Sequence, residues 1–289
     1  MAVVDAAPPG AAKAQARPRR AWVANLGVTV PGAVIALVAL ACFLGPLVLP
    51  IPKPVGGDIL EARLPAFSPG HLLGTDGSGN DVLSRLLHGG RTSLYVAVAV
   101  NALGLAIGGT LGALSAYAGG IVDTIIMRVL DVFIAFPSLV LILAVAQSLG
   151  PSRTNSILAL AFFSVPAFAR VSRAATLSLR ELPFMQAAKL SGTSTRRVLL
   201  RHIAPNITPQ LITFGMLGMG LVIVLEGALS FLGLGIPLPQ PSWGNMISEG
   251  QESLGAAPML VVWPSLMLFV TVLAFNLFGE ALRSRWSSR

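Results

Sequence analysis

The sequence predicts an all-α membrane protein with six transmembrane helices, and three observations indicate it. The 289 residues are 54% apolar and only 11% charged, whereas soluble domains carry about 25% charged residues. The apolar residues form several runs close to or above the about 20 residues that a helix needs to span the hydrocarbon core. Basic clusters recur at alternate ends of these runs, as expected when Lys and Arg stay on the cytoplasmic side.

The first 90 residues divide into three parts. Residues 1–25 are rich in Ala, Pro and Arg and predict a cytoplasmic basic tail, with a contact to anionic lipid as an alternative. Residues 26–50 form the first predicted transmembrane helix. Residues 51–90 predict an external linker that ends in an amphipathic helix through Val82, Leu86 and Leu87, lying at the outer membrane surface.

A calcium site is not expected in this linker, although Asp76, Asn80 and Asp81 lie close together among glycines. The ligand order of a twelve-residue calcium loop and its closing glutamate are missing. These side chains are expected to satisfy the backbone of a turn.

Residues 91–282 are predicted to form a domain with the other five spans. The second span covers about Ser93 to Tyr117, and Gly104, Gly108 and Gly112 recur on one of its faces. Small residues at this spacing predict a close helix–helix contact. Asn101 in the same span is expected either to hydrogen-bond to another helix or to line a pore.

The third span, from about Ile121 to Gln147, is predicted to bend at Pro137. Its first half carries Asp123, Arg128 and Asp131. Charged residues inside a membrane are functional candidates. However, Arg128 and Asp131 are one turn apart and predict a structural ion pair.

The remaining spans are about 156–171, 207–225 and 258–278, and residues 283–289 predict a cytoplasmic C-terminal tail. In the fifth span, Met216 and Met219 are expected either to pack or to line the pore. Glu226 is expected to be a buried ion partner or part of an outer gate. Residues 227–257 contain no Lys or Arg, which is typical of an outer loop, and Trp243 is expected to pack there.

The stretch from Arg180 to Pro205 is too polar and basic to cross lipid. It predicts a first short helix around Phe184 to Leu190, which Gly192 ends because glycine adopts turn angles readily. Thr193 and Ser194 are expected to cap a second helix. That helix carries the basic residues and leads to a proline suited to a first helical turn; the residues singled out in it are Arg196, Arg197, Arg201 and Pro205.

This stretch resembles the cytoplasmic coupling loop of bacterial ABC importer permeases through Gln186, Ala187, Ala188, Gly192 and Pro205. Gln186 departs from the glutamate of that motif. Two further blocks, His71–Leu94 and Leu225–Gly250, resemble the C-type subunit of the dipeptide/oligopeptide/nickel permeases. The resemblance runs from about residue 71 to the C-terminus.

The resemblance implies a type I ABC importer permease fold in a bacterial cytoplasmic (inner) membrane, with both termini cytoplasmic. It implies that the fifth span lines the pore. The implied cargo is peptide in the first place, and nickel chelates or haem are the less favoured cargoes. The implied partners are a homologous second permease, two cytoplasmic ABC ATPases that bind ATP and Mg, and an extracytoplasmic substrate-binding protein. The residues implied to contact the ATPase are Phe184, Met185, Gln186, Ala187, Ala188, Lys189 and Gly192.

The residues themselves argue against an enzyme. None of the three lysines follows a glycine, so the Gly-Lys-Ser/Thr of a P-loop is missing. Cys42 is the only cysteine and the three histidines are scattered, so we expect no metal site and no cofactor bound by this chain. Nucleic-acid binding is not expected, because most basic residues lie at the ends of apolar runs, where the membrane topology explains them. A gradient-driven carrier and a non-transporting receptor or scaffold remain the alternatives.

Overall fold

The structure, a computed structural model, describes residues 19–287, and this part of the chain is all-α. Five helices are long and apolar enough to cross a membrane, and a sixth span results if one sharply bent helix pair counts as one. The helices are α1 (Arg19–Val48), α2 (Val82–Leu103), α3 (Gly109–Ala118), α4 (Gly120–Ile134), α5 (Ser138–Leu149), α6 (Arg153–Arg180), α7 (Pro183–Leu190), α8 (Thr195–Arg197), α9 (Ala204–Phe231), α10 (Trp243–Gln251) and α11 (Met259–Ser287). A 3₁₀ turn covers Ile59–Glu61, and two π-helical segments, η2 (Gly104–Gly108) and η3 (Val198–Ile203), join α2 to α3 and α8 to α9.

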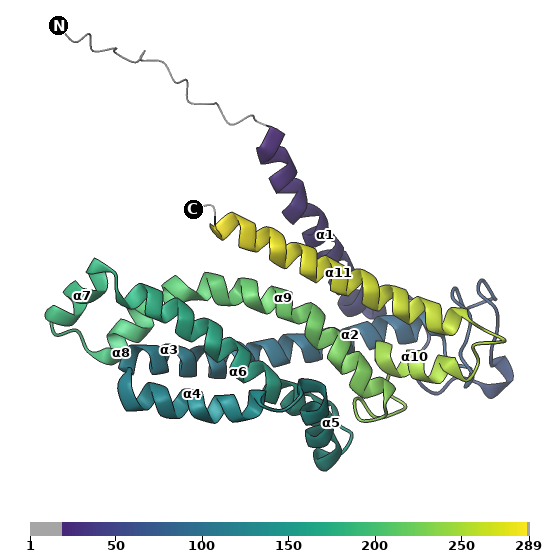
Figure 1. The fold of residues 1–289 in the computed structure, drawn as a ribbon. Coiled ribbons are helices and arrows are strands. Elements are labelled where there is room, and N and C mark those ends of the chain that lie inside the picture. Colours follow the sequence, from purple (N-terminus) through teal and green to yellow (C-terminus); the bar gives the residue numbers. More distant parts are fainter. Residues whose placement is uncertain (1–18, 288–289) are drawn as a thin grey trace, which may run out of the picture.

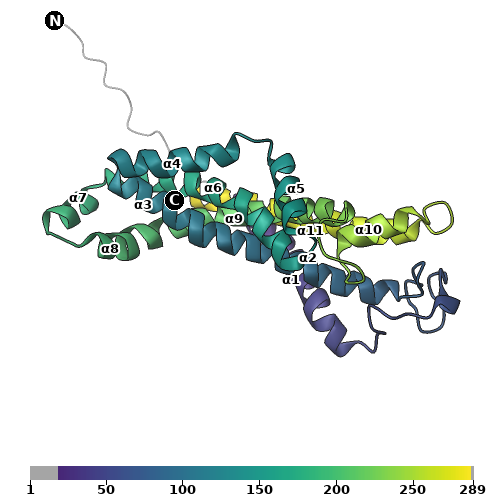
Figure 2. The same cartoon turned by 90° about the horizontal axis from the view of Figure 1, so that it is seen from below.

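The helices form an elongated bundle with two distinct ends (Figure 1). Helix α7 lies at one end, while α10 and the loops between α1 and α2 lie at the other (Figures 1 and 2). Helix α11 packs along both α9 and α1. The start of α1 and the end of α11 lie toward the α7 end (Figure 1).

A seam of glycines holds α2, η2 and α3 against α6, as their spacing predicts. A Cβ added at Gly104 would meet Ser164 and Phe168, and one added at Gly108 would meet the Val165 carbonyl. At Gly112 the obstacle is the Ala169 carbonyl. The backbones are therefore in contact, and the predicted helix–helix packing is confirmed.

The predicted amphipathic helix is not a separate element. Asp81 caps α2, its carboxylate accepting a hydrogen bond from the Ser84 amide at 2.6 Å, and the helix then continues through the second span to Ala118. Gly89 and Gly90 do not end it. A Cβ at Gly90 would clash with Cys42 and Trp243. This glycine therefore lets those two side chains pack close to the α2 backbone and does not form a turn.

Pro137 breaks the third span into two helices. Helices α4 and α5 meet at 86°, and α5 starts directly after the proline, because proline is tolerated at a helix start but not in its interior. The kink predicted at Pro137 is confirmed in its position, and it is a full break of the helix rather than a bend within it.

Pro205 lies in the first turn of α9, as the sequence predicts, but it does not interrupt the helical chain. The chain is helical without a break from Thr195 to Phe231. The proline ring would clash with the carbonyl four residues earlier in a regular α-helix. The π-helical segment Val198–Ile203 widens the turn just before the proline, which gives the ring room.

The glycine seam can be tested by two neighbouring substitutions. Gly108→Ala should lower the unfolding temperature of the purified complex, because the added methyl meets backbone atoms that cannot rotate away; overpacking of this kind costs about 1–3 kcal/mol. Gly109→Ala is the control, since its Cβ meets side-chain methyls of Leu211 and Leu105 at 3.4 and 3.8 Å and no backbone atom of another helix within 4 Å. Equal unfolding temperatures for the two variants would contradict the seam.

Candidate functional site

Helix α7 projects from one end of the bundle and is anchored by a single buried side chain (Figure 1). Met185 is 4% exposed and belongs to a buried cluster. Phe184 and Leu190 are 42% and 90% exposed, and Ala187 is also exposed. The other members of the cluster come from α3, α6, η3 and α9: Ala113, Phe168, Ala175, Val198, Ile203, Ile207 and Leu211.

Gly192 ends the segment as the sequence predicts. Its φ is +69°, and the Thr193 amide donates to the Ala188 carbonyl at 3.1 Å, which is the long hydrogen bond of a Schellman helix end. Ser194 occupies the N-cap of α8, but its side chain makes no capping hydrogen bond. The turn is thus fixed by the glycine rather than by the hydroxyl.

The other predicted coupling residues are largely solvent-accessible. Gln186 is exposed, with its amide nitrogen 3.5 Å from the Glu181 carbonyl, and Ala188 is half-buried. The Lys189 side chain lies outside the described residues. Arg196, Arg197, Arg201 and Pro205 are exposed.

Of the predicted pore residues, Asn101 and Met219 meet inside the bundle. Asn101 is 8% exposed; its amide donates to the Ala97 carbonyl at 2.9 Å and lies 3.5 Å from the Met219 sulfur. Asn101 therefore joins α2 to α9. This contact between helices is one of the two roles predicted for it. Met216 is partly buried against the same core.

Glu226 is fully buried, and its partners are hydroxyls rather than cations. Ser93 and Ser230 each donate to its carboxylate at 2.7 Å. The carboxylate thereby ties the outer end of α9 to α2. Among the described residues it has no ion-pair partner, so the predicted buried ion pair is not found.

The ion pairs of the third span differ from the prediction. Asp131 pairs with Arg170 on α6 at 2.7 Å, and Asp123 accepts two hydrogen bonds from Arg173 at 2.6 and 2.7 Å. Arg128 makes no ion pair within the described part of the chain. The predicted Arg128–Asp131 pair is wrong because α6 packs beside α4 and brings arginines within reach of both carboxylates.

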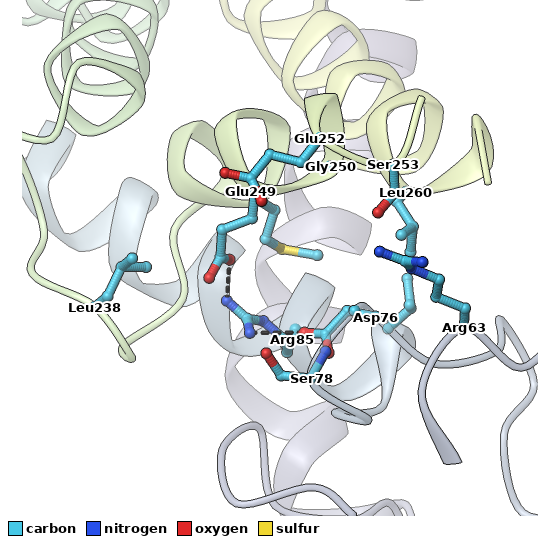
Figure 3. A pocket seen from close by; sticks show the side chains of 13 residues that line it. Arg63, Asp76, Ser78, Arg85, Leu238, Glu249, Gly250, Glu252, Ser253 and Leu260 are labelled. Atoms are coloured by element: carbon cyan, nitrogen blue, oxygen red, sulfur yellow. Dashed lines mark hydrogen bonds and ion pairs between the residues drawn. The ribbon is translucent and has the colours of Figure 1, made fainter. Parts of the chain in front are cut away.

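At the opposite end of the molecule, a cavity of about 320 Å³ is built around Arg85 (Figure 3). Arg85 is 3% exposed; it lies 2.7 Å from Asp76 of the outer loop and 2.5 Å from Glu249 of α10. Burial raises the pKa of Glu249, against the nearby Arg85 charge. Trp243 is buried in the same region and donates to the Leu86 carbonyl at 3.0 Å, which confirms its predicted packing.

The outer loop is organised by its own side chains, as the sequence predicts. The Asp76 carboxylate accepts from the amides of Ser78 and Asn80 at 2.8 and 2.9 Å. Asp81 also binds His71, with 2.8 Å between Nδ1 and the carboxylate. This hydrogen bond holds the pKa of His71 above its ordinary value, although burial acts against it.

The Arg85 cluster was not found from the sequence. Arg85 and Glu249 are separated by 164 residues, and no local rule pairs them. The one available signal was an arginine among the apolar residues of the predicted amphipathic helix.

The Arg85 cluster predicts that Arg85→Gln loosens the outer loop. The change leaves two partly buried carboxylates without their cation, and breaking a buried pair costs about 3 kcal/mol. Limited proteolysis of the 51–81 segment should accelerate by tenfold or more. Arg63→Gln, on an exposed arginine that lines the same cavity, should digest like the wild type. A loop equally protected in both variants would contradict the role of Arg85.

These features define a class of protein: a helical membrane component with an exposed element at one end and an ordered loop assembly at the other. Residues 104–289 match the family described as binding-protein-dependent transport system inner membrane component. The chain belongs to this family. It is an ABC importer permease, hence a multi-span inner membrane protein, and its family implies ATPase and substrate-binding partners.

Similar proteins support this assignment. Over 216 residues the chain is 42% identical to the glutathione transport system permease protein GsiD of Pectobacterium atrosepticum, covering 75% of this chain and 72% of that protein. Over 221 residues it is 39% identical to the dipeptide transport system permease protein DppC of Alkalihalophilus pseudofirmus, covering 76% and 73%. The fold resembles a chain of the inward-facing MetNI methionine ABC transporter, with a TM-score of 0.55, 16% identity, and 69% and 95% coverage.

Proposed function

We propose that this chain is the membrane-spanning subunit of an ATP-driven importer of di- and oligopeptides, and that α7 is its contact with a partner ATPase. The observation that carries this proposal is the contrast within α7. Phe184, Ala187 and Leu190 are exposed beyond the bundle, while Met185 is buried in it. An amphipathic helix that offers an apolar face is suited to a groove on a partner protein.

The buried cluster around Met185 explains how motion of α7 reaches the spans. Its other members lie on α3, α6, η3 and α9, so a displacement of α7 moves side chains of three spans at once. Packed interiors transmit such shifts because they have little free volume. The exposed Arg196, Arg197 and Arg201 provide a basic surface beside α7 for the same partner.

The proposed assembly contains two ATPases that bind ATP and Mg, a homologous second permease and an external binding protein. This chain binds no cofactor itself, in keeping with the missing Gly-Lys-Ser/Thr motif. The basic residues around α7 support a cytoplasmic position for that end. Both termini are proposed to be cytoplasmic, because the start of α1 and the end of α11 lie toward α7 (Figure 1).

Small peptides are the proposed cargo because the glutathione and dipeptide permeases are both similar to this chain over three quarters of its length. Glutathione and dipeptides share a peptide bond and free carboxylates. The ordered outer segment around Arg85 and α10 is the surface proposed to receive the binding protein.

Reconstitution tests the proposal as a whole. The chain, purified with the products of neighbouring genes and placed in proteoliposomes, should take up labelled dipeptide only when ATP is supplied on the α7 side. Uptake driven by a proton or sodium gradient in this chain alone would establish a carrier instead. Binding of a soluble partner without uptake under any condition would establish a scaffold.

The role of α7 is tested by Ala187→Asp. A carboxylate placed in the proposed groove would be buried without a partner, and losing a contact in this way costs about 2–5 kcal/mol. Uptake should therefore fall by tenfold or more, while membrane insertion is retained and ATP hydrolysis no longer responds to cargo. Ala256→Asp, the same change at an exposed turn beyond α10, is the control for membrane insertion and for basal hydrolysis without the binding protein. Wild-type coupling in Ala187→Asp would contradict the contact.

A further inference from the structure

A charged cavity of about 450 Å³ lies between α4 and α6. Its charged lining consists of Asp123, Arg128, Asp131, Arg170 and Arg173. The two carboxylates are each paired with an arginine of α6. The cavity therefore holds two neutralised pairs and one additional cation, Arg128, which is exposed and has no ion-pair partner in the described residues.

The cavity lies in the inner half of the membrane. Arg170 precedes the end of α6 at Arg180 by about 15 Å, given a rise of 1.5 Å per residue. Asp131 follows the start of α4 at Gly120 by a similar distance. Since α7 follows α6 directly, both positions are measured from the helix ends that are proposed to be cytoplasmic. The 28 residues of α6 are about 42 Å long, more than the about 30 Å of the hydrocarbon core, so the cavity lies near the inner boundary of that core.

Lipid is unsuited to this face of the protein. Two ion pairs and the additional cation Arg128 line this one cavity, and charged side chains within membrane spans face a bundle interior or a water-filled cavity rather than lipid. Water or another protein must therefore cover it.

The break between α4 and α5 is independent support that lipid does not cover this face. The residues at the break, Ala135, Phe136 and Pro137, are exposed, and they directly follow the helical turn that carries Asp131. Irregular backbone at membrane depth is tolerated only where it is buried in protein or lines a water-filled cavity. Nothing else in the described chain buries this backbone.

We propose that the cavity between α4 and α6 opens onto the aqueous path of the cargo, and that the Arg128 guanidinium binds a carboxylate of the cargo as it passes. This inference rests on the proposed peptide import and names the residue that meets the charged end of the peptide. A guanidinium matches a carboxylate through two parallel hydrogen bonds. The cavity has room for that group together with several waters, each of which occupies about 30 Å³ in the liquid.

The paired arginines explain why Arg128 rather than its neighbours has this role. Arg170 and Arg173 are already bound to Asp131 and Asp123, and a cargo carboxylate would have to displace those partners. Arg128 has no such competitor within the described residues. Arg128 also lies on α4, the helix that ends at the break, about two helical turns before that point.

Water access is tested first by thiol labelling. Cys42 is the only native cysteine, so Cys42→Ala gives a cysteine-free chain. In this background, Met127→Cys, at a residue that lines the cavity, should react in the assembled complex with charged, water-soluble thiosulfonates. Ile125→Cys is the matched control on the exposed apolar face of α4 and should not react. Failure of both thiols to react would overturn the aqueous path.

The same thiol reports on the charge of Arg128. The anionic reagent should react with Met127→Cys faster than the cationic one, and adding Arg128→Gln should lower that ratio by about tenfold, the effect of a unit charge about 6 Å away in water. Arg128→Lys should keep most of the preference. An unchanged ratio in Arg128→Gln would mean that the guanidinium does not face the water-accessible cavity, and it would overturn the proposal.

Cargo binding is tested by uptake in the reconstituted complex, with a free-acid dipeptide and its C-terminal amide. Arg128→Gln should reduce free-acid uptake by about tenfold more than amide uptake, relative to the wild type, whereas Arg153→Gln at the outer turn should reduce neither. The binding protein is identical in all samples, so the ratio isolates the permease. If wild-type uptake of the free acid needs no ATP, the proposed function itself fails. If it needs ATP and Arg128→Gln affects both cargoes equally, only this inference fails.

Discussion

The close backbone contact between α3 and α6 is the constraint on which the rest of the structure depends. Helices in a membrane gain little from hydrophobic burial, so association relies on close packing of small residues. Gly108 and Gly112 bring α3 onto the carbonyls of Val165 and Ala169, and the Ser172 hydroxyl adds a hydrogen bond to the Gly109 carbonyl at 2.6 Å. This contact fixes α6, which carries the arginines of the charged cavity and leads directly into α7.

Local patterns in the sequence predicted the features that depend on local geometry. The four-residue spacing of the glycines predicted the seam, because residues four apart share a helix face. Gly192 predicted the end of α7, because its φ of +69° strains any residue with a Cβ. The effect of the prolines was less predictable. A proline removes one hydrogen bond wherever it stands, but the surroundings decide whether the helix breaks, as at Pro137, or widens into a π-helical turn, as before Pro205.

The charged partners were the least predictable part of the sites. The sequence rule favours neighbours on one helix, and so it paired Arg128 with Asp131. In the structure, contacts between helices prevail: the Arg173 fork binds both oxygens of Asp123, a geometry that a pair within one helix turn does not readily provide. Likewise, Arg85 joins segments that are remote in sequence. Such pairs follow from the packing of the bundle, which no short stretch of sequence contains.

The position of α6 connects the two ends of the proposed mechanism. The end of α6 that leads to α7 is proposed to be cytoplasmic, and the half of α6 next to it is bound to α4 through Asp123 and Asp131. Helix α4 ends at an 86° break, where the absence of regular hydrogen bonding lowers the resistance to bending. A shift of α7 under the proposed coupling would move α6, and the ion pairs would transmit that shift to α4 but not rigidly to α5. The break would then absorb the motion, so that the cavity with Arg128 changes shape while the outer end, fixed by Arg85 and Glu226, keeps its packing.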